Sequence, residues 1–376
     1  MTVELRVIRN DASIRARRPA PGRAKRVFPA IVDPIVEPVE TVVAHSIDEL
    51  GRREWDSLFA NELEDWHYLR ALERAQLERC EPIYFAIRSR GRLVAAAPAF
   101  VGRRALAEPW RVRGRAQWGC SPARALVLGS PFAAACRIGF APRTTTAEQG
   151  LLADRLLRAA RHESRLRGLD GLLVSSDAAP GDACQRAESL RIACTRGASA
   201  ARISLPRWSL ADYLSCFDDG LRGQLLRICA QAAQYDRDWH VDLDRDLEPM
   251  LALCRDAGLD EIGETFFGVL LGSSTVSAEC LLVRSGDGGL AGFSIVLHDV
   301  RALREKLTVV SRRENGALVR GVIWLETLRF CLERGIGAYE SATELSLSAA
   351  RPHELVQRSG WIAADDAVGV AAPASG

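Results

Sequence analysis

An arginine-rich loop separates a strand-like segment from a helical one in the second half of the chain. Residues 307–311 read Leu-Thr-Val-Val-Ser, and a helical pattern follows the loop. A helix that begins at such a loop presents free N–H groups and the positive end of its dipole to an anion, and glycine permits close approach. The alternative is a solvated loop in which Asn315 only caps the helix. Because arginine adds bidentate contacts to phosphate, we predict a phosphate site formed by Arg312, Arg313, Asn315, Gly316 and Ala317.

Groups that could move a proton follow this helix, on the strand-like segment 338–341 and just beyond it. The candidates are Tyr339, Glu340 and Glu344, since a carboxylate can take up a proton and a tyrosine can return one. The alternatives are a tyrosine packed in the core and glutamates that are solvated or paired with arginine. His353 is a further candidate base, for which a position on a helix surface is the alternative.

Asp219 and Arg222 stand at the start of an amphipathic helix expected at residues 221–235. If this helix borders a cleft between two domains, these side chains could help to bind a substrate. The alternative is that an acidic residue in the first turn only complements the helix dipole.

The elements around these residues occur twice, in the same order. A strand, a tight turn and a second strand are expected at 83–98 and again at 280–297. A helix, a left-handed glycine and a strand are expected around Gly168 and again around Gly335. We therefore predict an internal duplication of one α/β unit, in which helices cover a mixed sheet.

The chain accordingly divides into three regions. Residues 1–40, rich in arginine and proline, are predicted to form an N-terminal extension, residues 41–200 a first domain, and residues 201–376 a second domain that holds the phosphate loop. Two local predictions complete this scheme. One helix is expected from Ser46 to about residue 59, and a strand is expected at 239–243.

The order strand hairpin, strand, Arg-x-x-Gly loop, helix and strand resembles the acyl-CoA N-acyltransferase (GNAT) fold. In that family a [RQ]-x-x-G-x-[GA] loop holds the pyrophosphate of the donor. The segment Arg313-Glu-Asn-Gly316-Ala-Leu318 matches the first two fixed positions, and Leu318 replaces the last one. The corresponding segment of the first half, 143–150, has no such loop. The resemblance therefore implies that the second half binds the donor.

A tandem pair of such folds resembles the Fem-type peptidyltransferases and the FemAB-like bacterial proteins of peptidoglycan biosynthesis. The likeness runs over residues 45–362 and includes Trp55-Asp-Ser-Leu-Phe59 and Phe217-Asp-Asp-Gly-Leu-Arg222. It implies an N-acyltransferase that moves an acyl group from acyl-CoA, or an aminoacyl group from aminoacyl-tRNA, to the amine of a small molecule or peptide. No tightly bound cofactor is implied. The alternative is a non-catalytic binding or accessory protein, which is favoured by Leu318 and by the lack of Lys or His in residues 340–351.

The composition excludes several other classes of protein. The 376 residues carry 50 basic and 48 acidic side chains, and a net charge of +2 is too small for a protein that coats DNA. Only Lys25 and Lys306 are lysines, and we attribute the excess of arginine to coding bias. The histidines and cysteines show neither HExxH nor close pairing, so no metal site is predicted. No apolar run would span a bilayer, and cysteines without a CxxC pair predict a reduced cytoplasm.

Overall fold

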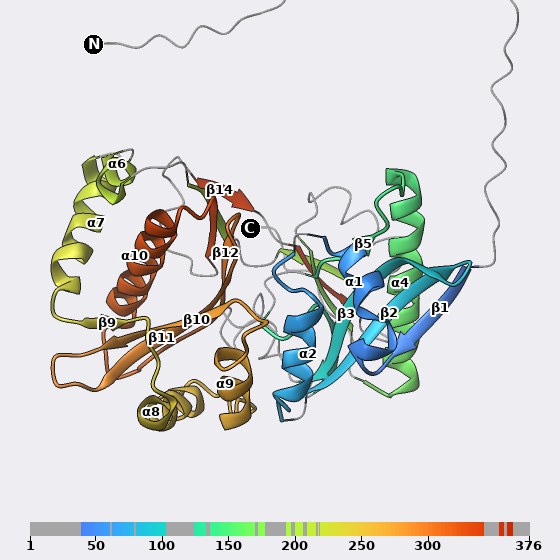
Figure 1. Ribbon diagram of the computed structural model, residues 1–376, viewed down its shortest axis with the longest axis horizontal. Coiled ribbons are helices and arrows are strands. Elements are labelled where there is room, and N and C mark those ends of the chain that lie inside the picture. Colours follow the sequence, from blue (N-terminus) through green and yellow to red (C-terminus); the bar gives the residue numbers. More distant parts are fainter. Residues whose placement is uncertain are drawn as a thin grey trace, which may run out of the picture. The chain divides into compact units, whose positions relative to one another are not determined.

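The two halves of the chain each form a mixed sheet that carries helices (Figure 1). The computed structural model describes residues 39–60, 62–78, 80–102, 124–132, 136–169, 172–176, 193–196, 200–205, 209–215, 217, 219–341, 353–356 and 359–363. All of them lie in one compact unit, Pro38–Gly376. Within these ranges, no helix combines the length and the apolar composition needed to cross a bilayer. The predicted α/β class with mixed sheets is confirmed.

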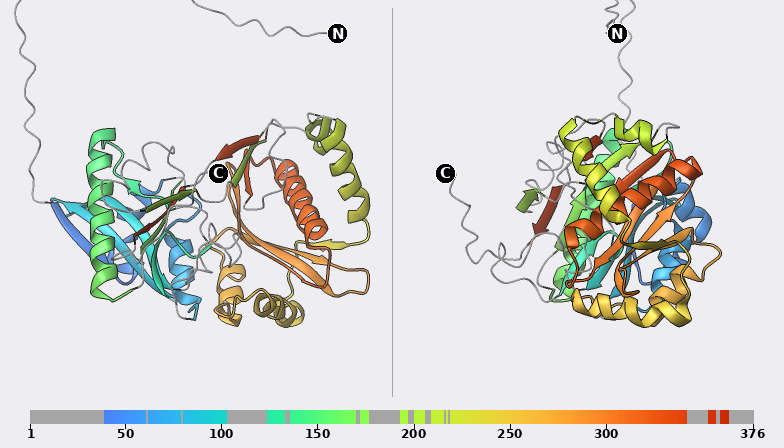
Figure 2. Two further views of the ribbon diagram at one scale, coloured as in Figure 1. Left: turned by 180° about the vertical axis from the view of Figure 1, so that it is seen from behind. Right: turned by 90° about the vertical axis from the view of Figure 1, so that its left-hand side faces the viewer.

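The first sheet has the strand order β1-β2-β3-β4-β6-β15-β7, with β5 beside β3. The strands are β1 (Val39–Ala44), β2 (Glu81–Ser89), β3 (Arg92–Gly102), β4 (Ala125–Leu128), β5 (Gly139–Phe140), β6 (Leu172–Ser176), β7 (Ala193–Arg196) and β15 (Ser359–Ala363). Apolar residues of α4 (Thr146–Leu166) pack on one face (Figure 2), and those of α1 (Arg52–Leu58) and α2 (Trp66–Arg74) pack on the other.

The second sheet has the order β14-β8-β13-β12-β11-β10-β9. The strands are β8 (Ala200–Ser204), β9 (Asp236–Asp238), β10 (Ala278–Arg284), β11 (Leu290–His298), β12 (Leu303–Val310), β13 (Ala338–Ser341) and β14 (His353–Val356). Helices α6 (Leu210–Ser215), α7 (Asp219–Ala232) and α10 (Gly316–Arg334) pack on one side, and α8 (Leu243–Asp256) and α9 (Glu264–Leu271) pack on the other.

The predicted repetition of elements is present in these sheets. In each half an antiparallel hairpin is followed by a strand, a long helix and a strand parallel to the previous one, β4 with β6 and β12 with β13. Both long helices end before a glycine in the left-handed region, Gly168 with φ of 59° and Gly335 with φ of 67°. We call residues 39–196 the first half and residues 200–356 the second half.

Two local predictions are wrong, and backbone geometry explains both. The helix expected from Ser46 is interrupted at Gly51, whose φ of 76° breaks it into a 3-10 turn, Ile47–Glu49, and helix α1. The strand expected at 239–243 is absent, and the described strand there is β9. Asp242 accepts a hydrogen bond from the N–H of Asp244, so this segment begins helix α8 instead of a strand.

Strand β15 does not follow the division into consecutive halves. It lies in the predicted second domain, yet it pairs antiparallel with β6 and β7 of the first sheet. Strand β8 pairs with β13 and β14 of the second sheet, next to the predicted boundary at residue 200. The predicted division into three regions stays a prediction. Of the predicted extension 1–40, only Val39 and Glu40 lie within the described residues, and they begin β1.

The two halves share an apolar core. One cluster of buried residues combines side chains of α1 and α2 with side chains of α8, α9 and the second sheet. Helices α2 and α9 pack on each other, and the rings of Phe132 and Phe266 lie 5.5 Å apart between centroids. Burial of apolar surface thus contributes to holding the halves together.

Candidate functional site

The loop between β12 and α10 brings the predicted phosphate-site residues together at one helix N-terminus. The Asn315 side chain accepts a hydrogen bond of 3.2 Å from the N–H of Leu318 and so caps the helix. Arg312 and Arg313 are exposed, and within the described part of the chain neither enters an ion pair. The first turn of α10 holds no acidic residue. Gly316 and Ala317 stand at the first two helical positions, whose N–H groups have no acceptor inside a helix.

Arg320 is a third basic residue at this helix start, and the sequence reasoning missed it. Its guanidinium lies 3.3 Å from the point where a Cβ on Gly316 would be. Residues four apart share one face of a helix, so the spacing from Gly316 to Arg320 was the signal. Glu314 is the acidic exception in the loop, and its carboxylate accepts a hydrogen bond of 3.1 Å from the Tyr235 hydroxyl.

At the equivalent helix start in the first half, that of α4, the carboxylate of Glu148 occupies the position near the free N–H groups. Thr145 caps α4, and its N–H donates to Glu148 at 2.8 Å while its hydroxyl accepts from the N–H of Glu148. The side-chain and backbone hydrogen bonds from Thr145 lower the pKa of Glu148, which keeps it an anion. A phosphate approaching α4 would therefore meet a negative charge, whereas at α10 it would meet arginines.

Strands β12 and β13 pair over only two positions. Leu303 lies opposite Tyr339 and Arg304 opposite Glu340, and β12 then continues to Val310 with no further register partner among the described residues of β13. On its other side β12 stays paired with β11, but Ile295 is opposite Leu307 and Val296 is opposite Glu305.

Lys306 is therefore an extra residue, and it forms a β-bulge. The bulge reverses the alternation of side chains along β12. Glu305 points to the α10 side, where the Tyr339 hydroxyl donates to its carboxylate. Lys306 and Leu307 both point to the opposite side, toward the core shared with the first half.

Tyr339 and Glu340, two predicted catalytic residues, point to opposite sides of β13. Tyr339 is fully buried; burial, followed by the nearby charge of Glu305, raises its pKa well above 10. The Glu305 carboxylate also accepts from Ser341 Oγ at 3.1 Å. This geometry makes Tyr339 a partner of Glu305 in the core, which was the alternative considered for it. Glu344 lies outside the described residues.

Glu340 belongs to a cluster of charges that spans the two halves. Arg304 Nε donates to Glu340 at 2.7 Å, and Arg304 Nη1 donates to Glu64 Oε1 of the first half at 3.3 Å. Lys306 Nζ lies 2.7 Å from the same Glu64 oxygen, and Ser130 Oγ donates to the other one. Burial raises the pKa of Glu64, but the charges of Lys306 and Arg304 outweigh it and lower the pKa to about 2. Glu64 is thus a permanent anion at neutral pH and a poor proton acceptor.

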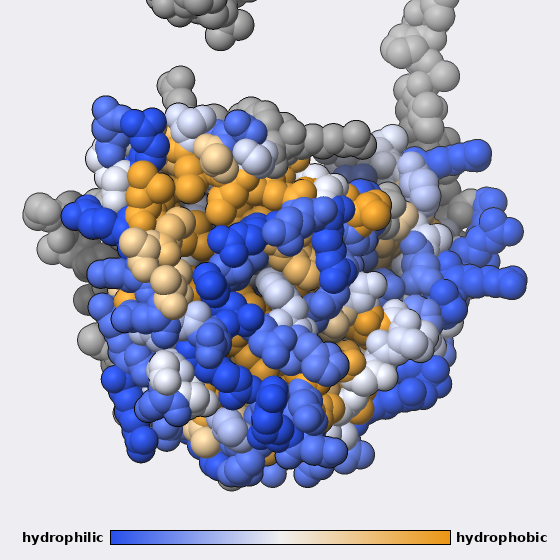
Figure 3. Space-filling model, turned by 60° about the vertical axis from the view of Figure 1, so that its left-hand side comes forward, coloured by the Kyte–Doolittle hydropathy of each residue, from blue (hydrophilic) through white to orange (hydrophobic). Residues whose placement is uncertain are grey.

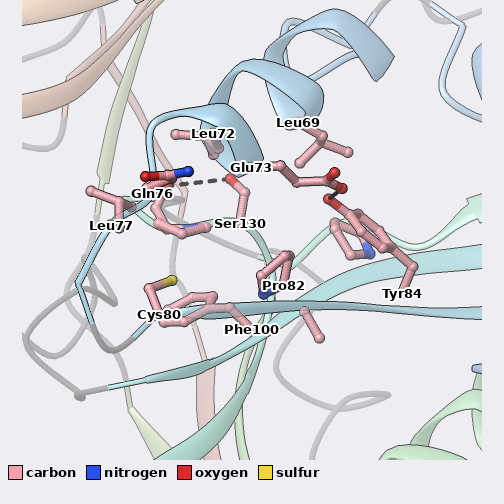
Figure 4. A pocket seen from close by; sticks show the side chains of 13 residues that line it. Leu69, Leu72, Glu73, Gln76, Leu77, Cys80, Pro82, Tyr84, Phe100 and Ser130 are labelled. Carbon is pink, nitrogen blue, oxygen red and sulfur yellow. Dashed lines mark hydrogen bonds between the residues drawn. The ribbon is translucent and has the colours of Figure 1, made fainter. Parts of the chain in front are cut away.

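A small cavity of about 40 Å³ lies in the first half beside this cluster (Figure 4). Its wall is mainly apolar, with Leu69 and Leu72 of α2 and Phe100 of β3, and it includes Ser130. Burial raises the pKa of the Cys80 thiol in this wall to about 12, so that thiol is a weak nucleophile.

Asp219 and Arg222 form an ion pair with each other on the first turn of α7. The Asp219 side chain is 91% exposed. Charged and apolar side chains mix on the face that Figure 3 turns forward, which includes α7, and Leu226 of this helix is 53% exposed. The pair has the geometry of a solvated partner to the helix dipole, and its role in acceptor binding stays a prediction.

Comparison with solved structures identifies the fold. A tandem GNAT protein from the clavulanic acid biosynthesis pathway matches 87% of this chain and 98% of its own, with 16% identity and a TM-score of 0.53. The chain has the tandem GNAT fold. FemX matches 85% of this chain and 96% of its own, with 10% identity and a TM-score of 0.49. No family model and no curated protein matches the sequence. The match to the tandem GNAT protein confirms the predicted fold.

Proposed function

We propose that the protein is an N-acyltransferase whose second half holds the phosphates of an acyl donor at the start of α10. The observation that carries this proposal is the difference between the two helix starts. Arg312 and Arg313 stand before α10 with no acidic residue in its first turn, whereas Glu148 occupies the start of α4. Acyl-CoA, with its pyrophosphate, is the preferred donor.

The rest of the donor would lie along β12. The side of β12 that faces β13 has no strand partner beyond Arg304 among the described residues. An extended chain that carries amides can add to such a strand edge. The amine of the acceptor would attack the acyl carbonyl carbon, the thioester C–S bond would break, and the proton of the amine would pass through Glu340 to the thiolate. Alignment of donor and amine would supply most of the rate.

A second candidate is a non-catalytic binding or accessory protein. It is favoured by Leu318, which stands where the donor loop of the GNAT family has Gly or Ala, and whose N–H is already engaged by the Asn315 side chain. An aminoacyl-tRNA donor remains within the proposal, because its transfer chemistry also ends on an amine.

The test is binding of acetyl-CoA measured by calorimetry, with native mass spectrometry for co-bound CoA. Wild type should bind, and Arg313→Ala should weaken binding by about tenfold or more, the value of one charge-assisted contact. Arg143→Ala is the matched control, since Arg143 is an exposed arginine in the corresponding loop of the first half.

The outcomes separate the candidates. Equal weakening by Arg143→Ala would contradict a site at α10. If wild type binds no CoA but transfers an aminoacyl group from charged tRNA to an amine, the tRNA donor is correct. If it does neither, the non-catalytic candidate is correct.

A further inference from the structure

Glu64 and Lys306 form an ion pair between the two halves at the bulge of β12. Lys306 is one of two lysines in the sequence, and its side chain is 3% exposed. Its Nζ lies 2.7 Å from Glu64 Oε1 and 5.3 Å from the centre of the Tyr68 ring. Ser130 Oγ donates to the second Glu64 oxygen. The first half therefore surrounds this ammonium group with a carboxylate and an aromatic face.

Cohesion of the two halves does not account for this pair. The neighbouring core already joins them through α2 with α9 and through Phe132 with Phe266. Leu307 and Val309 of β12, on the same side of the sheet as Lys306, are buried in that core. Apolar side chains in place of a buried ion pair often give equal or greater stability. Stability is therefore a weak explanation for the presence of a buried ion pair at this position.

The bulge connects the pair to the proposed transfer site. An extra residue in β12 turns Lys306 toward the first half, and bulges beside active sites commonly re-aim a side chain in this way. Arg304, two residues earlier, binds both Glu64 and Glu340 at the point where the pairing of β12 with β13 ends. One carboxylate of the first half therefore contacts both basic side chains at the bulge.

We propose that Glu64 is a positioning residue for acyl transfer: through Lys306 and Arg304, the first half holds the bulge of β12 and so aligns the donor with the acceptor amine. Glu64 contacts no reacting atom in this scheme. The inference rests on the proposed function, because Glu64 would fix the geometry of β12, the strand along which the donor would lie.

The first test needs no donor. Hydrogen exchange of the β12 amides is compared between wild type, Glu64→Gln and Glu163→Gln. Glu163 is the matched control, since its side chain is 17% exposed and its ion pair with Arg167 lies within the first half. We expect faster exchange at residues 305–307 in Glu64→Gln alone, with the β10–β11 amides unchanged. Unchanged exchange at 305–307 would overturn the inference.

The second test is kinetic. At saturating acetyl-CoA, Glu64→Gln should lower kcat by about tenfold to 10²-fold, the effect of a small misplacement of reactants, while the Kd for acetyl-CoA stays within about twofold. The ratio of thioester hydrolysis to amine transfer should rise, and Lys306→Arg should retain more transfer than Lys306→Met. Wild-type kcat in Glu64→Gln, or an equal fall in Glu163→Gln, would overturn the inference.

The two proposals fail in different experiments. Absence of any donor binding by wild type contradicts the proposed function and leaves the exchange result intact. Normal donor binding and transfer in wild type, together with normal exchange and kcat in Glu64→Gln, contradicts the positioning role alone.

Discussion

Helices α4 and α10 both begin with a neutral cap residue that accepts a backbone hydrogen bond, yet their first turns carry different charge. Glu148 returns a carboxylate to the start of α4, while the start of α10 is flanked by Arg312, Arg313 and Arg320. Each helix lies in the chain between two strands that pair in parallel, β4 with β6 and β12 with β13. Under the proposed function, a single residue in the third helical position decides whether the helix start can bind an anion.

The two halves also differ in the strand before the helix. In the second half β12 has a bulge at Lys306, whereas the four described residues of β4 pair with β3 in a continuous register. The bulge is occupied by Glu64 from the first half. The first half thus supplies a carboxylate to the bulge residue of the second half.

The largest effect is expected from removing that side chain. Glu64→Ala removes the carboxylate that Lys306 contacts at 2.7 Å and one of the carboxylates that Arg304 contacts, and the free energy of unfolding should fall by about 3–5 kcal/mol. Glu248→Ala, which breaks the exposed ion pair with Arg255, should cost less than about 1 kcal/mol. Urea denaturation measures both. Equal losses would mean that Glu64 is an ordinary surface partner.

The next largest effect is expected from giving the start of α10 the carboxylate that is present at the start of α4. Leu318→Glu places a carboxylate at the third position of α10, where α4 has Glu148, and should weaken acetyl-CoA binding by about 10²-fold through repulsion of phosphate. Leu318→Gln has nearly the same shape without the charge and is the control. Equal binding by the two variants, in calorimetry at one ionic strength, would show that charge does not distinguish the helices.

Acid unfolding tests the same charge cluster by protonating Glu64 instead of removing it, so a smaller effect is expected. The pKa of Glu64 is lowered from 4.5 to about 2, so its contribution to stability is complete above pH 4.5 and is lost as the pH falls toward 2. In Lys306→Met the opposing charge is reduced, burial raises the pKa, and the loss should begin at a higher pH. Urea midpoints measured in steps from about pH 6 to pH 2 give the two profiles. Coincident profiles would exclude Lys306 as the main cause of the low pKa.

The smallest effect is expected at the left-handed glycine that follows the long helix in each half. Gly168 and Gly335 both have a positive φ, and neither has an atom within 4 Å of an added Cβ. Alanine at either position should therefore cost only the strain of the left-handed backbone, about 1–2 kcal/mol. Equal shifts in thermal unfolding would support the repeat. A loss at one glycine only would show that the two helix ends are not equivalent.

Local signals explain which parts of the fold could be predicted from sequence. Asn315, Gly168 and Gly335 act on their own helix ends, so their types and spacing were sufficient. Gly51 also acts locally, but the sequence does not show that a glycine after a capping box will adopt a positive φ. The strand expected at 239–243 failed because Asp242 competes locally by capping α8.

The charge cluster could not be predicted, because its members are distant in the chain. Glu64 and Lys306 are 242 positions apart, and a bulge of one residue decides which side of the sheet Lys306 faces. The rarity of lysine was the available signal. Only two of the 50 basic residues are lysines, and Lys306, which lies in β12, places a compact ammonium at the bulge.

Strand β15 has a consequence for how the protein is made. It lies between β6 and β7, so the first sheet lacks an inner strand until residues 359–363 exist. A ribosome adds about 5–20 residues per second, so β6 and β7 each lack this partner until the second half has been synthesised. A nascent chain that stalls after β14, or a gene cut after β14, would therefore leave the first sheet without an inner strand.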